Sequence, residues 1–363
     1  MAQKKSQKTV NRKKSHYGQG KELIPLKQYD LKGHKTASSI LKGMALTSFT
    51  GRTIGEAADV LETMVKDENC FRVLTLSGAM TVAQMGMLIY EMLAAGWFDV
   101  VVSTGALITH GLVQSIGRTH FKTPKNFDDR RLYAQAYNRV YDTIELETNL
   151  DDVEEMFNDH ILKNLVGQEN LTLCSYKICD LIGEHLKQTL PKRDKAILKI
   201  AHEKKIPIFI PAFTDSELGL DMGIYRYAQK LKGQKQINFN PFLDLDLYAN
   251  LIQTAVKMDK KLGIFTIGGG VPRNWAQQVG PFLDIRAVRL GEKHGALARF
   301  TYGVRICDAP VTNGGLSGCT YREGVSWGKF VPEEEGGRQA EVVADATAIL
   351  PLLITGVMER MKK

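Results

Sequence analysis

The sequence has no run of eighteen apolar residues, and it has only five cysteines among 363 residues. A transmembrane helix needs about 20 consecutive apolar residues, so we expect no membrane span. The basic N-terminus has no apolar segment behind it, which argues against a secretory signal and predicts a cytoplasmic protein. The cysteines are odd in number and in no metal-ligand spacing, a pattern that predicts reduced thiols and no metal site.

Acidic residues are missing from the first 21 positions. The basic residues before Glu22 account for nearly all of the formal net charge of +8: Lys4, Lys5, Lys8, Arg12, Lys13, Lys14 and Lys21. We predict that residues 1–40 form a basic, partly disordered arm that keeps the protein soluble. Contact with a neighbouring subunit's site is an alternative role, and contact with nucleic acid is the less favoured one. No proline- or serine-rich linker follows, so residues 41–363 are predicted to form one catalytic domain.

Short apolar runs alternate with helical stretches through this domain. Continuous apolar or β-branched runs, typical of strands buried on both faces, occupy residues 71–76, 99–104, 206–211, 263–268 and 299–307. A helix is predicted over residues 84–97, and a capping-box spacing from Thr53 to Glu56 predicts a helix start. Region 127–204 is predicted to pack as helices around the sheet. The rhythm predicts an α/β fold with a Rossmann-like, doubly wound, mainly parallel sheet flanked by helices.

Small and polar residues follow four of the predicted strands. They are residues 76–81, 103–106, 214–215 and 268–270. Ligands of such folds bind beyond the carboxyl ends of the strands, where small residues and helix N-termini suit phosphate oxygens. The recurrence favours a dinucleotide, although the sequence contains no G-x-G-x-x-G fingerprint and single glycines after strands are usually turns.

The segment REGVSWGKF at residues 322–330 places Lys329 near an indole and a carboxylate. Partial burial would lower the pKa of this lysine and free its amine to attack carbonyls or imines. The alternative is a strand end with a packed Trp327 and a snorkelling lysine. If the segment is extended, its alternation places Glu323, Val325, Trp327 and Lys329 on one face.

Together these motifs resemble the deoxyhypusine synthase family. The resemblance runs from about residue 45 to 358 and rests on LSGAMT (76–81), VVSTGA (101–106), IPIFIPAFTD (206–215), IGGGV (267–271), EGVSWGK (323–329) and VVADATAILPLL (342–353). It implies an enzyme that uses NAD to oxidise spermidine, passes the aminobutyl group through an imine to a lysine, and transfers it to an acceptor amine. It also implies a homotetramer.

The resemblance assigns roles residue by residue. Lys329 matches the imine-forming lysine, and Glu323 and Trp327 match residues of the polyamine channel. The positions that match NAD contacts are Ser77, Gly78, Ala79, Met80, Thr81, Thr104, Gly105, Ala106, Asp215, Gly269, Asp308, Asp345 and Ala346. The purely structural alternative for the glycines is a tight turn, and the structural alternative for Asp345 is a helix N-cap.

Three polar anchors of the family are changed in this chain. Thr109-His110 replaces a Glu-Glu pair, Asn274 replaces a histidine, and Leu316 replaces an aspartate. Asp221 or Glu217 could still hold a terminal ammonium. His110 is either a proton shuttle or a structural hydrogen-bonding residue. Asn274 and His110 are therefore candidate substrate-binding residues rather than retained anchors.

These departures leave donor and acceptor open. The favoured function is NAD-dependent aminobutyl transfer from a spermidine-type polyamine to a small amine or a protein lysine. Transfer to putrescine, as in homospermidine synthesis, is the leading alternative. A NAD-dependent amine dehydrogenase or hydrolase, and a non-catalytic NAD-binding assembly, are the others.

Overall fold

The computed structural model describes residues 23–78, 80–165, 172–292 and 297–362. Its centre is a parallel sheet of six strands in the order β11-β10-β9-β1-β2-β7. The strands are β1 (Cys70–Leu76), β2 (Val100–Val102), β7 (Ile208–Phe209), β9 (Lys261–Ile267), β10 (Phe300–Ile306) and β11 (Arg338–Val342). The strand order grows outward on one side of β1 and then on the other, so the predicted doubly wound α/β fold is confirmed.

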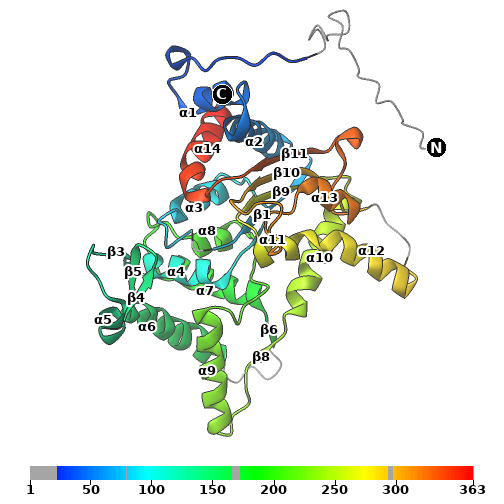
Figure 1. Cartoon of the computed structure of the whole chain (residues 1–363). Coiled ribbons are helices and arrows are strands. Elements are labelled where there is room, and N and C mark those ends of the chain that lie inside the picture. Colours follow the sequence, from blue (N-terminus) through cyan, green and yellow to red (C-terminus); the bar gives the residue numbers. More distant parts are fainter. Residues whose placement is uncertain (1–22, 79, 166–171, 293–296, 363) are drawn as a thin grey trace, which may run out of the picture.

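Helices cover both faces of this sheet (Figure 1). Alternate strand residues point to opposite faces: Leu74 and Phe265 belong to one apolar cluster, and Val73 and Ile264 belong to the other. The first cluster includes residues of α1 (Ala37–Ala45), α2 (Phe49–Lys66), α3 (Gly86–Ala94), α4 (Gly105–Ser115), α7 (Ser175–Thr189), α8 (Ile197–Glu203) and α14 (Ala346–Met361). The second includes residues of α10 (Phe242–Lys257), α11 (Gly270–Gln277) and α12 (Val279–Leu290).

The remaining elements include two smaller sheets and several helical segments. A three-stranded antiparallel sheet joins β3 (Phe121–Lys122), β5 (Thr143–Leu146) and β4 (Tyr137–Val140), and a parallel pair joins β6 (Thr172–Leu173) and β8 (Asn238–Phe239). The other helical segments are α5 (Asp129–Ala134), α6 (Glu147–Met156), α9 (Glu217–Leu231), α13 (Tyr321–Ser326), η2 (Leu31–Gly33), η3 (Phe157–Leu162), η4 (Lys163–Leu165) and η5 (Glu333–Glu335). Of these, α6, α9 and η3 contribute residues to the first cluster, and α13 contributes Tyr321 to the second. None of the helices in the described ranges is long and apolar enough to cross a membrane.

The predicted strands correspond to β1, β2, β7, β9 and β10, whereas two other expectations were wrong. Region 127–204 is not only helical, because it contains the hairpin of β4 and β5. All four residues of β4 are exposed, so its sequence carries no apolar alternation. The helix expected to start at Thr53 begins at Phe49, with Ser48 as its N-cap residue.

Helix α2 packs closely against α1. A Cβ at Gly55 would lie 2.4 Å from the backbone nitrogen of Ala45, so the glycine lets α2 pack directly against α1. Thr53 then lies inside the helix, where its hydroxyl donates to the Thr50 carbonyl at 3.1 Å. The division into an arm and a catalytic domain stays a prediction, and residues 1–22 of the arm lie outside the described residues.

Candidate active site

The turns after β1 and β9 meet at the carboxyl edge of the sheet. The backbone N–H of Gly269 donates to Ser77 Oγ at 2.8 Å. Gly268 has a φ of +84°, and a Cβ at this position would lie 2.0 Å from Ser77 Oγ. The strand order reverses between β1 and β9, so this cradle lies at the switch point where doubly wound folds bind their ligands.

The turn after β2 is tied to the turn after β1. Thr104 Oγ1 donates to the Gly78 carbonyl at 3.0 Å and accepts from Leu107 N at 3.2 Å, so Thr104 caps α4. Thr81 is fully buried, and its hydroxyl donates to the Leu107 carbonyl at 2.8 Å. These hydroxyls therefore hold the two turns in register. Ala79, another predicted cofactor contact, lies outside the described residues.

Predicted cofactor residues also follow the other strands. Asp308 comes after β10, and Asp345 comes after β11 and caps α14 by accepting from Thr347 N at 2.9 Å. The N-cap interpretation of Asp345 is thus confirmed, while both carboxylates remain exposed at the same edge as Ser77. Asp215 is exposed directly before Ser216, the N-cap of α9. A Cβ at Gly105 would lie 2.3 Å from the side chain of Ser216, so α4 and α9 begin side by side. Met80, Ala106 and Ala346 lie in or beside these same turns.

A cavity of about 470 Å³ contains the predicted catalytic lysine. It begins at Gly270, next to the cradle residue Gly269, and lies between α11, the loop 315–320 and the segment from α13 to Lys329. The side chains at its wall include Arg273, Asn274, Leu316, Cys319, Glu323, Trp327 and Lys329. The fold therefore brings together the lysine, two of the predicted channel residues and two of the changed anchors.

The segment REGVSWGKF is not an extended strand, so the predicted alternation is wrong. Residues Tyr321–Ser326 form helix α13, capped by Thr320, whose hydroxyl accepts from Glu323 N at 3.1 Å. Helical spacing places Glu323 and Trp327 on one face. The chain then turns at Gly328, which has a φ of +67°, and Lys329 pairs its carbonyl with Phe300 N at 2.9 Å. Glu323, Trp327 and Lys329 still line one cavity, because the helix and the turn bring their side chains to it.

The surroundings of Lys329 keep its amine less basic than a free lysine. Its Nζ donates to Asn274 Oδ1 at 3.3 Å and lies 5.9 Å from the centroid of the Trp327 ring. Burial first, and then the positive charge of Arg273, lower the pKa of Lys329. Trp327 is 64% exposed, so the indole supplies only part of this burial. The direction of the pKa shift is the one expected, but its second cause, Arg273, was not anticipated.

Two buried arginines hold the loop beside the lysine, and sequence reasoning missed both. Arg273 donates to the carbonyls of Ser317 and Cys319 at 2.9 and 2.5 Å. Arg305 donates to the same carbonyls at 3.1 and 2.5 Å and pairs with Glu341 at 2.9 Å. The one available signal was an arginine inside the apolar run of β10, since a buried charge needs partners.

Leu316 lies on this loop with an unfavourable backbone conformation. Its φ is +61°, in the left-handed region that aspartate, asparagine and glycine adopt more readily than leucine. Its side chain is 64% exposed at the cavity wall. The backbone thus retains a conformation suited to the aspartate that the resemblance expects there.

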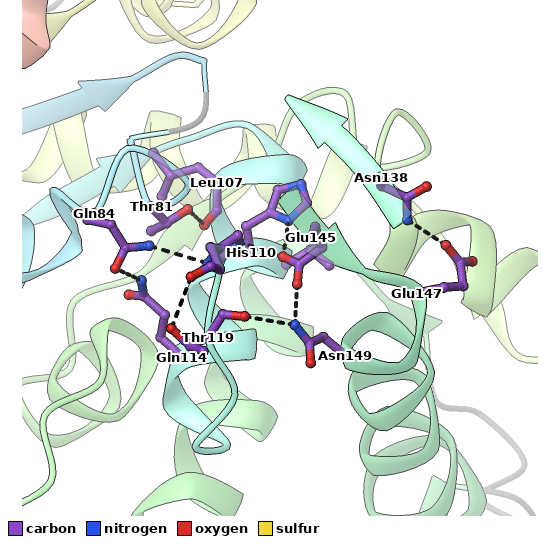
Figure 2. Close-up of polar contacts among 12 residues, drawn as sticks. Thr81, Gln84, Leu107, His110, Gln114, Thr119, Asn138, Glu145, Glu147 and Asn149 are labelled. Carbon is purple, nitrogen blue, oxygen red and sulfur yellow. Dashed lines mark hydrogen bonds and ion pairs between the residues drawn. The ribbon is translucent and has the colours of Figure 1, made fainter. Parts of the chain in front are cut away.

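His110 lies apart from the lysine cavity. It contacts Glu145 Oε2 through Nδ1 at 3.2 Å, and Asn149 Nδ2 donates both to Glu145 Oε1 and to the Thr119 carbonyl (Figure 2). Burial would raise the pKa of Glu145, but its close contacts with His110, His120 and Asn149 outweigh burial and lower the pKa to about 2. The neighbouring Thr109 is fully buried and donates to the Gly105 carbonyl at 3.1 Å.

Asp221 also lies apart from Lys329 within one chain. It belongs to α9, at the bottom of Figure 1, whereas α13 lies at the right of the sheet. Burial raises the pKa of Asp221 to about 7, and the nearby carboxylates of Glu154, Glu217 and Asp151 add to the effect. This acidic group would attract a cation.

Comparisons with known proteins match most of the chain. The profile of the family "Deoxyhypusine synthase" matches residues 39–357. A "Probable deoxyhypusine synthase 1" from Archaeoglobus fulgidus is 32% identical over 323 residues, which are 89% of this chain and 94% of that protein. A "Probable deoxyhypusine synthase 2" from Methanosarcina acetivorans is 30% identical over 90% of this chain and 88% of its own length.

A further relative has a similar name, and a solved structure has a similar fold. A "Deoxyhypusine synthase-like protein" from Chlorobaculum tepidum is 29% identical over 91% of this chain and 88% of its own length. The crystal structure of "a putative deoxyhypusine synthase from Entamoeba histolytica" covers 92% of this chain and 97% of its own, with a TM-score of 0.58 and 14% identity, and so supports the fold. From its sequence and its fold together, the chain belongs to the deoxyhypusine synthase family.

Proposed function

We propose that this protein is a NAD-dependent transferase that moves an aminobutyl group from a spermidine-type polyamine through an imine on Lys329. The observation that carries the proposal is a lysine with a lowered pKa in a cavity that borders the cradle of the β9 turn. A lowered pKa increases the fraction of neutral amine, which is the form that adds to a C=N bond.

The residues at the sheet edge fit NAD. The cradle of Gly268, Gly269 and Ser77 has no room for a Cβ at Gly268, so its backbone can approach a phosphate closely. The exposed carboxylates of Asp308 and Asp345 follow strands and suit ribose hydroxyls. When bound, NAD would take up the hydride that the donor amine loses and return it to the product.

The chain's own residues would perform the transfer. The neutral amine of Lys329 adds to the donor's C=N carbon, and the donor's nitrogen leaves with a proton as a free amine, so the C=N bond now joins Nζ. The acceptor amine then adds to this carbon and displaces Lys329 in the same way. Glu323 and the face of Trp327 would hold the substrate ammonium, a cation–π contact worth about 1–2 kcal/mol when desolvated.

The acceptor is a small amine or a protein lysine, and the changed anchors favour the small amine. Leu316 and Asn274 line the cavity without offering a carboxylate or an imidazole. A long polyamine with several charges would lack partners there, and an unpaired buried charge is costly. Between the two acceptors, these changes therefore support transfer to putrescine or a similar small amine.

An oligomer, which we propose to be a tetramer, would complete the site. Helix α9 carries an exposed apolar stripe at helical spacing: Leu220, Ile224, Tyr227 and Leu231. Exposed apolar stripes of this kind mark interaction surfaces. Asp221 lies beside the stripe. If α9 packs against a neighbouring subunit, the acidic group around Asp221 could lie near the lysine cavity of that subunit.

Borohydride trapping tests the covalent role of Lys329. Protein incubated with labelled spermidine and NAD, reduced and digested, should carry an aminobutyl adduct on Lys329, and omission of NAD should abolish the adduct. Lys329→Arg keeps the charge but cannot form the imine, so it should bind NAD normally and carry no label. Label on another residue, or full transfer by Lys329→Arg, would refute the proposed route.

A further inference from the structure

His110, His120 and Glu145 come from three separate parts of the chain and meet in the interior. His110 lies on α4, His120 precedes β3, and Glu145 lies on β5. Their potential ligand atoms all lie within 4.8 Å of one another. The side chains of Glu145 and His120 are each 1% exposed and that of His110 is 11% exposed.

Hydrogen bonding alone does not account for this arrangement. Glu145 Oε2 faces His110 Nδ1 at 3.2 Å and His120 Nε2 at 2.5 Å. The contact with His120 lacks hydrogen-bond geometry, and His120 Nε2 is buried without a hydrogen-bond partner. A buried polar atom without a partner is costly, and here it points at a carboxylate oxygen that a second imidazole already shares.

We propose that His110, His120 and Glu145 bind a divalent transition-metal ion, and that zinc is the ion they suit best. Two imidazoles and one carboxylate form a donor set used for zinc, with bonds of about 2.0–2.2 Å. Magnesium and calcium prefer oxygen ligands, so this set disfavours them. The proposal is independent of the transfer reaction and gives His110 a role other than substrate contact.

The surrounding amides support the ligands from behind. Asn149 Nδ2 donates to Glu145 Oε1 at 2.5 Å, which leaves Oε2 facing the two imidazoles. Gln84 Nε2 lies 3.4 Å from His120 Nδ1. Gln114 Nε2 donates to Gln84 Oε1 at 2.8 Å (Figure 2).

Reversing the side-chain amides of Gln84 and Gln114 would prepare His120 as a ligand. Exchanging the oxygen and nitrogen of both amides would let Gln84 accept from His120 Nδ1–H while Gln114 accepts from Gln84. The lone pair of His120 Nε2 is then free for the ion. Such outer partners fix the tautomer of a metal-bound histidine.

The ion would connect two parts of the molecule. Helix α4 packs on the six-stranded sheet and begins at its edge with the cap residue Thr104, whereas β5 is the middle strand of the antiparallel sheet. Three protein ligands leave a fourth zinc position for water or another small ligand.

Metal content and thermal stability of the tag-free full-length protein test the proposal. Protein loaded with zinc and desalted should retain about one ion per chain, and zinc should raise the melting temperature of chelator-treated protein. Cobalt in place of zinc should give the intense visible absorption of a four-coordinate site.

Two variants and one control separate metal binding from folding. His120→Asn should bind zinc at least tenfold more weakly, and Asn149→Ala should weaken binding about 10–100-fold. His202→Asn is the control, because His202 pairs with the exposed Asp180 at 2.7 Å elsewhere on the surface. Circular dichroism of the metal-free forms checks that each variant is folded. The proposal is overturned if wild-type protein retains no more zinc than His120→Asn and its melting temperature does not respond to zinc.

Discussion

Lys329 Nζ lies 3.3 Å from the amide oxygen of Asn274, so a neutral group occupies the position closest to the predicted nucleophile. A carboxylate there would favour the charged amine. We predict that Asn274→Asp raises the pKa of Lys329. Because only the neutral amine reacts, the rise of the trapping rate with pH should then occur at higher pH, which moves the acidic limb of the pH profile. The measurement is the rate of borohydride-trapped adduct as a function of pH. Asn274→Ala introduces no charge and should leave the limb near its original position. An unchanged profile in Asn274→Asp would show that the two side chains do not interact in solution.

The left-handed backbone of Leu316 predicts a stabilising substitution. Asparagine tolerates a φ of +61° better than leucine, and the exposed leucine loses little buried area when replaced. Leu316→Asn should therefore raise stability by about 1 kcal/mol, read as a shift of the denaturation midpoint. Leu316→Ala relieves no strain and serves as the control. Equal effects of the two substitutions would contradict the strain argument.

The same position should control the donor. Leu316→Asp adds a carboxylate to the wall of the lysine cavity and should lower the KM for spermidine by about tenfold or more, because it gives an ammonium a partner. Putrescine, which is shorter, should gain less. If the wild type and Leu316→Asp have the same KM for spermidine and the same KM for putrescine, Leu316 lies outside the substrate path.

Asp221 predicts a pH-dependent stability change. Its pKa is raised to about 7, chiefly by burial, so the folded protein holds the proton that the unfolded chain loses near pH 4. The stability of the wild type should fall relative to Asp221→Asn as pH rises from about 4 to 7. At pH 8 the variant should be more stable, by on the order of 2–4 kcal/mol before solvent screening reduces the difference. Denaturant unfolding at pH 4 and pH 8 measures it, with the exposed Asp215→Asn as control.

The apolar stripe of α9 predicts the assembly surface. Ile224→Lys places a charge in the middle of the stripe and should shift the protein to smaller species in light scattering. Phe49→Lys changes a residue that is even more exposed but lies on α2, and it should leave the mass unchanged. If Ile224→Lys keeps the wild-type mass, the stripe is not an interface. If the wild type is already a monomer, the proposed tetramer is wrong.

The central sheet could be predicted because its strands are buried on both faces. Val73 and Leu74 point to opposite clusters yet are both fully buried, so β1 reads as a continuous apolar run. β11 was missed because it is an edge strand that begins with the exposed Arg338 and in which the polar Gln339 and Glu341 alternate with buried Ala340 and Val342. Its charged residues hide the pattern, although Glu341 is held by Arg305.

The candidate site was only partly predictable, because some of its residues share one short motif and others meet only in the folded chain. Lys329, Trp327 and Glu323 were found because they share one short motif. Their real conformation is set by Thr320 as a cap and by Gly324, where a Cβ would lie 2.7 Å from the ring of Phe330. His120 and Glu145 are brought together by the antiparallel pairing of β3 with β5, and no spacing along the chain reveals such a contact.

The two arginines that hold the loop beside Lys329 grip its backbone carbonyls and none of its side chains. The path of the loop is therefore independent of which residue stands at position 316. Mutation can exchange that side chain without moving the wall that carries it. A substitution at position 316 would then change which amine the cavity prefers and leave the proposed role of Lys329 intact.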